Sequence, residues 1–269
     1  MFPRSTFSLA PVTARSARWL LLAVGGLAVA SAMAAPLEVL SPQGQLQQTA
    51  PLAWKAPPAA LLQFEVQARV KGIPFQTRAQ LDWRPQGQRY EAAQEVQVPL
   101  LGSRRQSSVG SLGAQGLQPA LFMDRSRKEH STTLDAQTGL IRFSRNGQTL
   151  PLQTGTQDRI SVFFQVAGML AAAPQRYPAG TQIRVHAVSS SRLAVWTFQV
   201  QNTETLQLPA GTMPAVRLQH LSDNHQDDDQ QSTLWLAPSL GYLPVRIHML
   251  ENAGRDELDL RLKSHAQPD

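Results

Sequence analysis

Apolar and polar residues alternate along most of the chain after residue 60. In the range 62–70, apolar residues at every second position are separated by Gln63, Glu65, Gln67 and Arg69. This period of two is typical of a strand with one buried face. The same pattern, with glycine and proline at the turns, predicts further strands over 75–83, 90–98, 104–112, 121–134, 140–144, 149–152, 182–188, 193–200, 205–208, 215–221, 232–236, 245–250 and 257–262.

One stretch, residues 152–173, breaks this period. Its apolar residues recur with the spacing of an α-helix, and a second apolar flank runs beside the first. A helix that is apolar on most of its surface is buried, and Pro174 ends it. The apolar face that we expect to meet a ligand consists of Ile160, Phe163, Phe164, Ala167 and Leu170.

Together these elements predict a mainly β protein. About a dozen short strands in meander order favour a curved antiparallel sheet, an open or half barrel, around one central buried helix. Because no linker divides the strands, we expect a single β-rich domain over 61–265. A lead-in over 35–60, rich in proline, glutamine and alanine, is expected to be flexible.

The first 34 residues follow the pattern of a secretory signal peptide. Arg4, Arg15 and Arg18 precede an apolar run of about a dozen residues, which is shorter than the ~20 residues of a membrane-spanning helix. Small residues follow, and cleavage is expected after Ala34. We therefore expect export to the periplasm, with no membrane-spanning segment after the signal is removed.

Charge and cysteine content narrow the class of protein. The formal net charge is +6, and loss of the three N-terminal arginines leaves 22 basic against 19 acidic residues, or +3. This modest excess is not gathered on one face, so nucleic acid is not an expected partner. The absence of cysteine excludes disulfides, thiolate metal sites, a cysteine nucleophile and a lipidated cysteine.

The polar start of the predicted helix is the first candidate site. Asp158 and Arg159 stand where the helix dipole is positive, so Arg159 and the helix N-terminus could anchor a carboxylate or phosphate. The alternative is structural: Asp158 or Thr156 caps the helix by accepting its first N–H groups. The capping interpretation is favoured because acids are stabilising at this position without any ligand.

An acidic stretch between two predicted strands is the second candidate site. It contains His220, Asp223, His225 and a run of three acids, Asp227, Asp228 and Asp229. Carboxylates and imidazoles together can hold a divalent cation. The spacing is not that of a calcium loop, and a run of like charges in a hairpin is usually solvated. We therefore expect no metal site.

No motif of a familiar enzyme is present. The sequence lacks a nucleophile elbow, a zinc-binding H-E-x-x-H helix, a phosphate loop and a dinucleotide fingerprint. A hydrolase would require Ser107, Ser108 or Ser111 to lie beside a histidine. We therefore expect neither catalytic residues nor a cofactor.

Several runs resemble a known family: SVGSLGAQGLQPALF, PLQTGTQDRISVFFQVAGML, ETLQLPAGTMPAVRL and LWLAPSLGYLPVRI, in this order. They are similar to the exported proteobacterial family called domain of unknown function 3108, over most of residues 62–262. The resemblance implies a curved antiparallel sheet similar in type to periplasmic lipoprotein-carrier half-barrels, which shelter acyl chains on a concave face. It implies no activity, cofactor or catalytic residue.

Two functions remain open from the sequence. The first is a periplasmic, non-enzymatic protein that binds an apolar ligand, such as a lipid or a lipoprotein acyl chain, on the concave face beside the helix. The second is a structural or protein-interaction module of the cell envelope, in which the helix fills the concavity. An apolar pocket of the ~300–1,000 Å³ usual for ligand sites would favour the first. A concavity packed solid with Phe163, Phe164 and Met169 would favour the second.

Overall fold

The computed structural model describes residues 37–47, 52–98, 102–221, 231–251 and 254–268, and residues 34–269 form one compact unit. One α-helix, α1, spans Ser161–Ala172. The strands before it are β1 (Leu37–Leu40), β2 (Ala60–Val70), β3 (Ile73–Gln86), β4 (Arg89–Val98), β5 (Gly102–Gly113), β6 (Gly116–Arg125), β7 (Glu129–Asp135), β8 (Leu140–Phe143), β9 (Thr149–Pro151) and β10 (Gln157–Asp158). Those after it are β11 (Gln182–Val188), β12 (Leu193–Leu208), β13 (Gly211–Leu221), β14 (Gln231–Ala237), β15 (Leu243–Glu251) and β16 (Asp256–Ala266), with short 3-10 helices η1 (Pro174–Arg176) and η2 (Pro238–Leu240).

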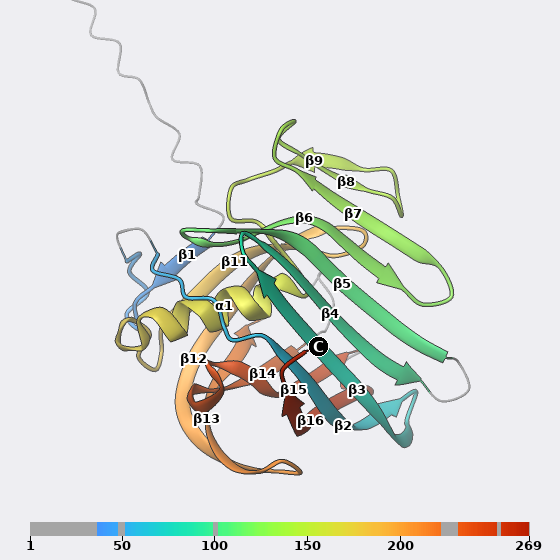
Figure 1. Ribbon diagram of the computed structural model, residues 1–269, viewed down its shortest axis with the longest axis vertical. Coiled ribbons are helices and arrows are strands. Elements are labelled where there is room, and N and C mark those ends of the chain that lie inside the picture. The colour runs from blue at the N-terminus through green and yellow to red at the C-terminus, as the bar shows by residue number, and fades with distance from the viewer. Residues whose placement is uncertain (1–36, 48–51, 99–101, 222–230, 252–253, 269) are drawn as a thin grey trace, which may run out of the picture. The chain divides into compact units, whose positions relative to one another are not determined.

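All sixteen strands belong to one sheet (Figure 1). Its order is β1-β11-β12-β13-β14-β15-β16-β2-β3-β4-β5-β6-β7-β8-β9, with antiparallel neighbours, and β10 pairs with β11 in parallel. The sheet is open, with β1 and β9 at the ends of this path. The prediction of a mainly β fold with a curved antiparallel sheet around one buried helix is confirmed, and the described residues form sixteen strands rather than about a dozen.

The structure corrects two strand boundaries. The single strand expected over 121–134 is two strands, β6 and β7, joined by a turn in which the Ser126 amide donates to the Lys128 carbonyl (3.0 Å). This turn has no glycine or proline to mark it. Conversely, the two strands expected over 193–200 and 205–208 are one strand, β12. A bulge between Val200 and Thr203 shifts its register and interrupts the period of two.

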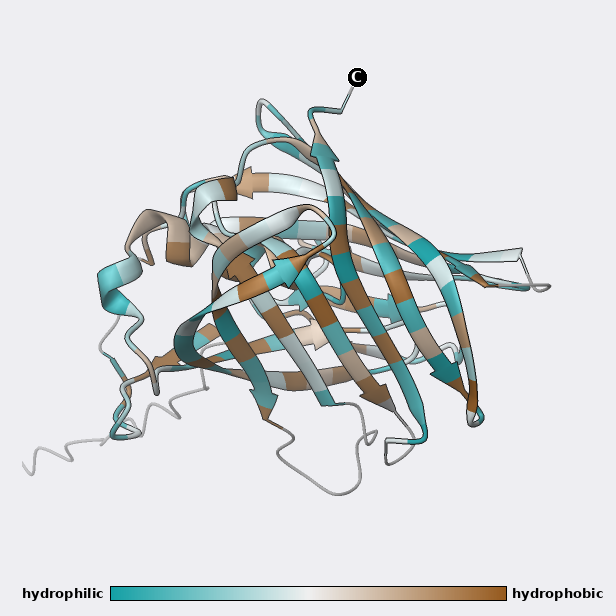
Figure 2. Ribbon diagram, turned by 90° about the horizontal axis from the view of Figure 1, so that it is seen from below, coloured by the Kyte–Doolittle hydropathy of each residue, from teal (hydrophilic) through white to brown (hydrophobic). Residues whose placement is uncertain are grey.

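Helix α1 lies within the curve of the sheet and supplies the centre of the core (Figure 1). Ten of its twelve residues are buried, as expected for a helix without a polar face. The Phe164 ring stacks on Trp83 of β3 with 4.2 Å between centroids, and Tyr90 of β4 packs against the same indole. Along the strands, hydrophilic and hydrophobic residues alternate (Figure 2), which turns one face of the sheet toward this core.

The chain before β2 also packs on this core. Part of the range expected as a flexible lead-in, 35–60, forms β1 at the edge of the sheet, where it pairs with β11. Further on, the Trp54 indole Nε1 donates a hydrogen bond to the Gln165 carbonyl (3.2 Å). The indole lies against Gly168, where a β-carbon would overlap the ring. Glycine at this position therefore lets the lead-in cross α1 closely.

Replacement of Gly168 by alanine tests this contact. Gly168→Ala should lower the free energy of unfolding by about 1–3 kcal/mol, the usual cost of overpacking, because the new methyl group displaces Trp54. In a Trp54→Ala background the same change meets no ring, and it should be neutral or stabilising by up to about 1 kcal/mol through helix propensity. Urea denaturation of the four proteins of this cycle measures the coupling. Equal costs in both backgrounds would show that the indole does not occupy this position.

Candidate functional site

A buried carboxylate, Asp158, organises the start of α1. Its Oδ1 accepts the amide N–H groups of Ile160 (2.9 Å) and Ser161 (2.8 Å), which are donors that the first helical turn leaves open. Its Oδ2 accepts the hydroxyl of Ser108 on β5 (2.5 Å). Since that hydroxyl donates its proton to Asp158, the Tyr90 hydroxyl donates to Ser108 Oγ (2.9 Å). Asp158 thus acts as the helix cap.

The same segment joins the helix to two distant parts of the sheet. The β10 backbone, Gln157 and Asp158, pairs in parallel with β11. The Gln157 side chain donates to the Leu117 carbonyl on β6 (2.9 Å), and Gln165 of α1 accepts the Leu117 amide (2.8 Å). Two buried glutamines therefore use the backbone of one β6 residue, which fixes α1 between β6 and β11.

Burial controls the ionisation of this network. Removal from water raises the pKa of Asp158 from 3.8 to about 6, although the hydrogen bonds from Ser108, Ser161 and Ile160 favour the ionised form. Burial also raises the pKa of Tyr90 well above its ordinary value, and the charge of Asp158 adds to this effect. Tyr90 therefore stays protonated, and Asp158 is the group that titrates below neutral pH.

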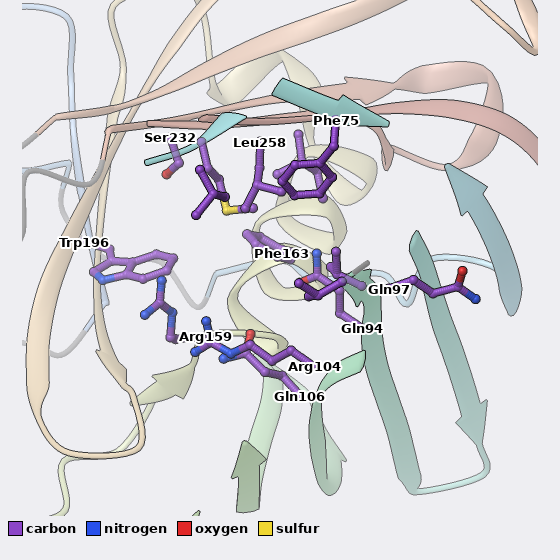
Figure 3. Close-up of a pocket in the computed structure, with 15 residues that line it drawn as sticks. Phe75, Gln94, Gln97, Arg104, Gln106, Arg159, Phe163, Trp196, Ser232 and Leu258 are labelled. Atoms are coloured by element: carbon purple, nitrogen blue, oxygen red, sulfur yellow. The ribbon is translucent and has the colours of Figure 1, made fainter. Parts of the chain in front are cut away.

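A cavity of about 180 Å³ lies beside the first turns of α1 (Figure 3). Fifteen residues line it, from strands on both sides of the helix and from α1 itself. They are Val70, Phe75, Gln94, Val96, Gln97, Val98, Arg104, Gln106, Arg159, Phe163, Trp196, Ser232, Ile247, Met249 and Leu258.

One side of the cavity is apolar. Phe75 and Leu258 lie together in Figure 3, with Phe163 of α1 between them and the group formed by Arg104, Gln106 and Arg159. Five of the lining side chains pack against the core but are only partly buried: Phe75, Val96, Trp196, Met249 and Leu258. Apolar surface that the core leaves accessible within a concave site is typical of a binding surface.

The other side of the cavity is polar, and its centre is an ion pair. Arg104 donates to both oxygens of Asp124 on β6, from Nε (3.0 Å) and Nη2 (2.7 Å), and Gln106 Nε2 donates to Oδ2 (3.1 Å). Burial alone would raise the pKa of Asp124, but the hydrogen bonds and charge of Arg104, with smaller effects of Gln106 and Arg159, bring it below its ordinary value. The Arg159 guanidinium lies 5.6 Å from the centre of the Trp196 ring.

The structure separates the residues that the sequence groups together. Of the predicted apolar helix face, Phe163 lines the cavity, while Ile160, Phe164, Ala167 and Leu170 are buried in the core. Of the predicted polar pair, Arg159 lines the cavity and Asp158 is fully buried beneath the helix. Sequence reasoning missed Arg104, Trp196, Met249 and Leu258. They occupy ordinary strand positions, so no local pattern distinguishes them from other inward-facing residues.

The remaining candidate residues have other surroundings. Ser108 bonds to Tyr90 and Asp158, and the Ser111 hydroxyl donates to Gln118 Oε1 (3.3 Å), so neither forms the serine–histidine pair that a hydrolase would need. The His220 ring packs 5.5 Å from Trp196 and 5.8 Å from Phe198. The predicted acidic loop, with Asp223, His225, Asp227, Asp228 and Asp229, lies outside the described residues. Within the part of the chain that the structure describes, no three His, Asp or Glu side chains are grouped as metal ligands would be.

The fold and the cavity define the class: an open antiparallel sheet that encloses one helix and a small cavity with an apolar and a polar side. The chain belongs to the family described as Protein of unknown function (DUF3108), whose model matches residues 63–261. The predicted family is thus confirmed. No curated protein matches the chain. In the described ranges, no helix has the length and apolar character needed to cross a membrane.

Solved structures give only distant likenesses. A predicted lipoprotein from Parabacteroides distasonis covers 81% of this chain and all of its own, with 10% identity and a TM-score of 0.31. A predicted exported protein with a YmcC-like fold from Bacteroides fragilis has the same coverage and TM-score, with 9% identity. A predicted outer membrane lipoprotein-sorting protein domain from Vibrio parahaemolyticus covers 78% of this chain and 85% of its own, with 6% identity and a TM-score of 0.27. Such distant likenesses assign no function to this chain.

The raised pKa of Asp158 predicts how stability depends on pH. Between pH 3.8 and about 6 the folded protein holds a proton that the unfolded chain has lost, so the contribution of Asp158 to stability falls as pH rises through this window. At about 1.4 kcal/mol per pH unit, the loss is about 3 kcal/mol. Asp158→Asn keeps an oxygen for the helix N–H groups and does not titrate. Its stability relative to wild type should therefore increase by about 3 kcal/mol from pH 4 to pH 7.

Urea denaturation at several pH values measures this difference. Comparing the two proteins cancels the other carboxylates, among them Asp135, whose pKa is lowered to about 2 by hydrogen bonds from Thr138, the Arg142 side chain and the Gln137 amide. As a control, Asp135→Asn removes a partly exposed carboxylate that titrates mainly below pH 4. Its stability relative to wild type should change by less than about 0.5 kcal/mol between pH 4 and pH 7. If wild type and Asp158→Asn follow parallel curves, Asp158 does not titrate in this range.

Proposed function

We propose that this chain is an exported, non-enzymatic periplasmic protein that binds an apolar ligand, such as a lipid acyl chain, in the cavity beside α1. One observation carries the proposal: Phe75, Val96, Trp196, Met249 and Leu258 line a common cavity and are only partly covered by the core. Water in contact with these side chains is unfavourable, and a ligand that replaces it gains roughly 25 cal/mol for each Å² of apolar surface covered.

Export is supported by the N-terminal segment. Its basic start, its apolar run of about a dozen residues and the small residues before Ala34 match the signal-peptide pattern. The absence of cysteine is compatible with an oxidising compartment, since no thiol is available for unwanted pairing. The test is the N-terminal residue of the protein recovered from periplasm, which should be Ala35.

The size of the cavity limits the ligand. At about 180 Å³ it is smaller than the ~300–1,000 Å³ of sites that enclose drug-sized ligands. A single acyl chain is therefore a better match than the several chains of a lipoprotein anchor. This volume shifts the proposal from lipoprotein carriage toward a simpler apolar ligand.

The envelope interaction module remains the second candidate function, and a specific observation favours it. Phe164 stacks on Trp83, and Met169 is fully buried, so the body of α1 fills most of the space inside the sheet. In this alternative, the helix has a purely structural role and the remaining cavity has no ligand. The two candidates differ in whether the cavity takes up an apolar molecule.

A cavity-filling substitution separates them. Val96→Phe places a larger side chain in the cavity, where there is room for it, and should abolish the binding of an apolar fluorescent dye while changing stability by less than about 1.5 kcal/mol. Dye titration of the purified protein, from which lipid has been removed, measures the effect. If wild type binds no dye and carries no lipid in native mass spectrometry, the interaction module is the better description.

A matched control is available on β12. Val195 is 44% exposed and does not line the cavity, whereas the next residue, Trp196, does. Val195→Phe therefore makes the same chemical change outside the cavity and should leave dye binding as in wild type. Equal loss of binding in both variants would place the dye elsewhere on the protein.

A further inference from the structure

We infer that the cavity beside α1 selects a single-chain amphiphile with an anionic head group, a carboxylate or a phosphate ester. The inference rests on the proposed function, because it assigns the chemical class of the ligand in the same cavity. It places the alkyl chain against Phe75, Met249 and Leu258, and the head group beside Arg104 and Arg159.

The lining of the cavity is divided in a way that matches an amphiphile. In Figure 3, Phe75 and Leu258 lie on one side of Phe163, and Arg104, Gln106 and Arg159 lie on the other. A purely apolar ligand would place hydrocarbon against the charged side of such a cavity, which is unfavourable. An amphiphile covers the apolar side with its chain and meets the polar side with its head.

The polar side consists of groups that favour an anion. Among the described residues that line the cavity there are two arginines and three glutamines, and no acid. Guanidinium groups bind carboxylate and phosphate through paired, charge-assisted hydrogen bonds. The carboxylate of Asp124 lies behind Arg104 and holds its Nε and Nη2. This ion pair fixes the direction of the Arg104 side chain, which is half exposed.

Arg159 is held on the same polar side of the cavity as Arg104 (Figure 3). Its guanidinium lies over the Trp196 ring, and its backbone amide donates to the Val188 carbonyl (3.2 Å). Two cations fixed on separate elements, β5 and the start of α1, therefore border the same space. Such preorganised charge selects an anion over a neutral or cationic head group of the same chain length.

The experiment compares head groups on one chain. Decanoate, decyl phosphate, 1-decanol and decyltrimethylammonium are titrated against the full, lipid-free protein by isothermal calorimetry or dye displacement. We expect one or both anions to bind roughly tenfold more tightly than 1-decanol, the effect of one charge-assisted hydrogen bond. Decyltrimethylammonium should bind most weakly. The two anions separate a fatty-acid source from a phospholipid-derived one.

Matched variants assign the selectivity to the cavity. Arg159→Gln should reduce anion affinity roughly tenfold and leave 1-decanol unchanged. The control is Arg105 of β5, which pairs with Glu95 (3.4 Å) and does not line the cavity. Arg105→Gln removes the same charge, and this variant should bind all four ligands as wild type does. The head-group comparison on wild type is a complete test even where Arg159→Gln does not fold.

The outcomes separate the two proposals. Equal binding of all four amphiphiles, or preference for the cation, overturns the inference and leaves the apolar-ligand function in place. Binding of none of them overturns the proposed function, and the inference with it. If Arg105→Gln reduces the preference for anions as much as Arg159→Gln does, the preference comes from general surface charge. This result also overturns the assignment to this cavity.

Discussion

The fold depends on the buried carboxylate of Asp158. Its Oδ1 accepts two amide N–H groups at the start of α1, and its Oδ2 accepts the hydroxyl of Ser108 on β5. Its own backbone belongs to β10, which pairs with β11. One residue therefore links the helix with strands from both halves of the sheet. A fully buried acid is unfavourable when ionised, and the pKa of about 6 reflects this cost. Its hydrogen bonds offset part of the cost and give α1 a defined position.

The position of α1 in turn explains why a cavity remains. The helix is apolar nearly all round, so a sheet that curves around it can bury ten of its twelve residues. Its middle meets Trp83 closely through Phe164. Just before its first turn, the charged side chain of Arg159 lines the space inside the sheet, where an apolar side chain would pack more closely. Arg104 of β5 lines the same space from the sheet. Close apolar packing therefore does not extend to the region of these two arginines. The helix fills one part of the concavity and borders a cavity in the other.

The sequence predicts elements better than it predicts the site, because the two depend on different information. The alternation of apolar and polar residues depends only on one strand and its buried face, so it was sufficient to predict most strands. The spacing of apolar residues was sufficient to predict α1. The alternation failed at the turn after β6 and at the bulge in β12, where no glycine or proline marks the change. The cavity depends on curvature and register across eight strands. Met249 and Leu258 have the same local pattern as fully buried residues, so only the assembled sheet distinguishes them.

The separation of Asp158 from Arg159 shows this difference most directly. As helix residues, the two side chains would both lie at the positive end of the dipole and could share one anion site. Gln157 and Asp158 instead form a strand, and successive side chains of an extended backbone point in different directions. Asp158 is therefore directed into the core as the cap, and Arg159 is directed into the cavity beside Trp196. The acid is buried in its own network, and the adjacent cation lines the cavity. A short parallel strand ahead of the helix thus gives Asp158 a structural role and places Arg159 in the cavity lining, where we propose that it binds a ligand.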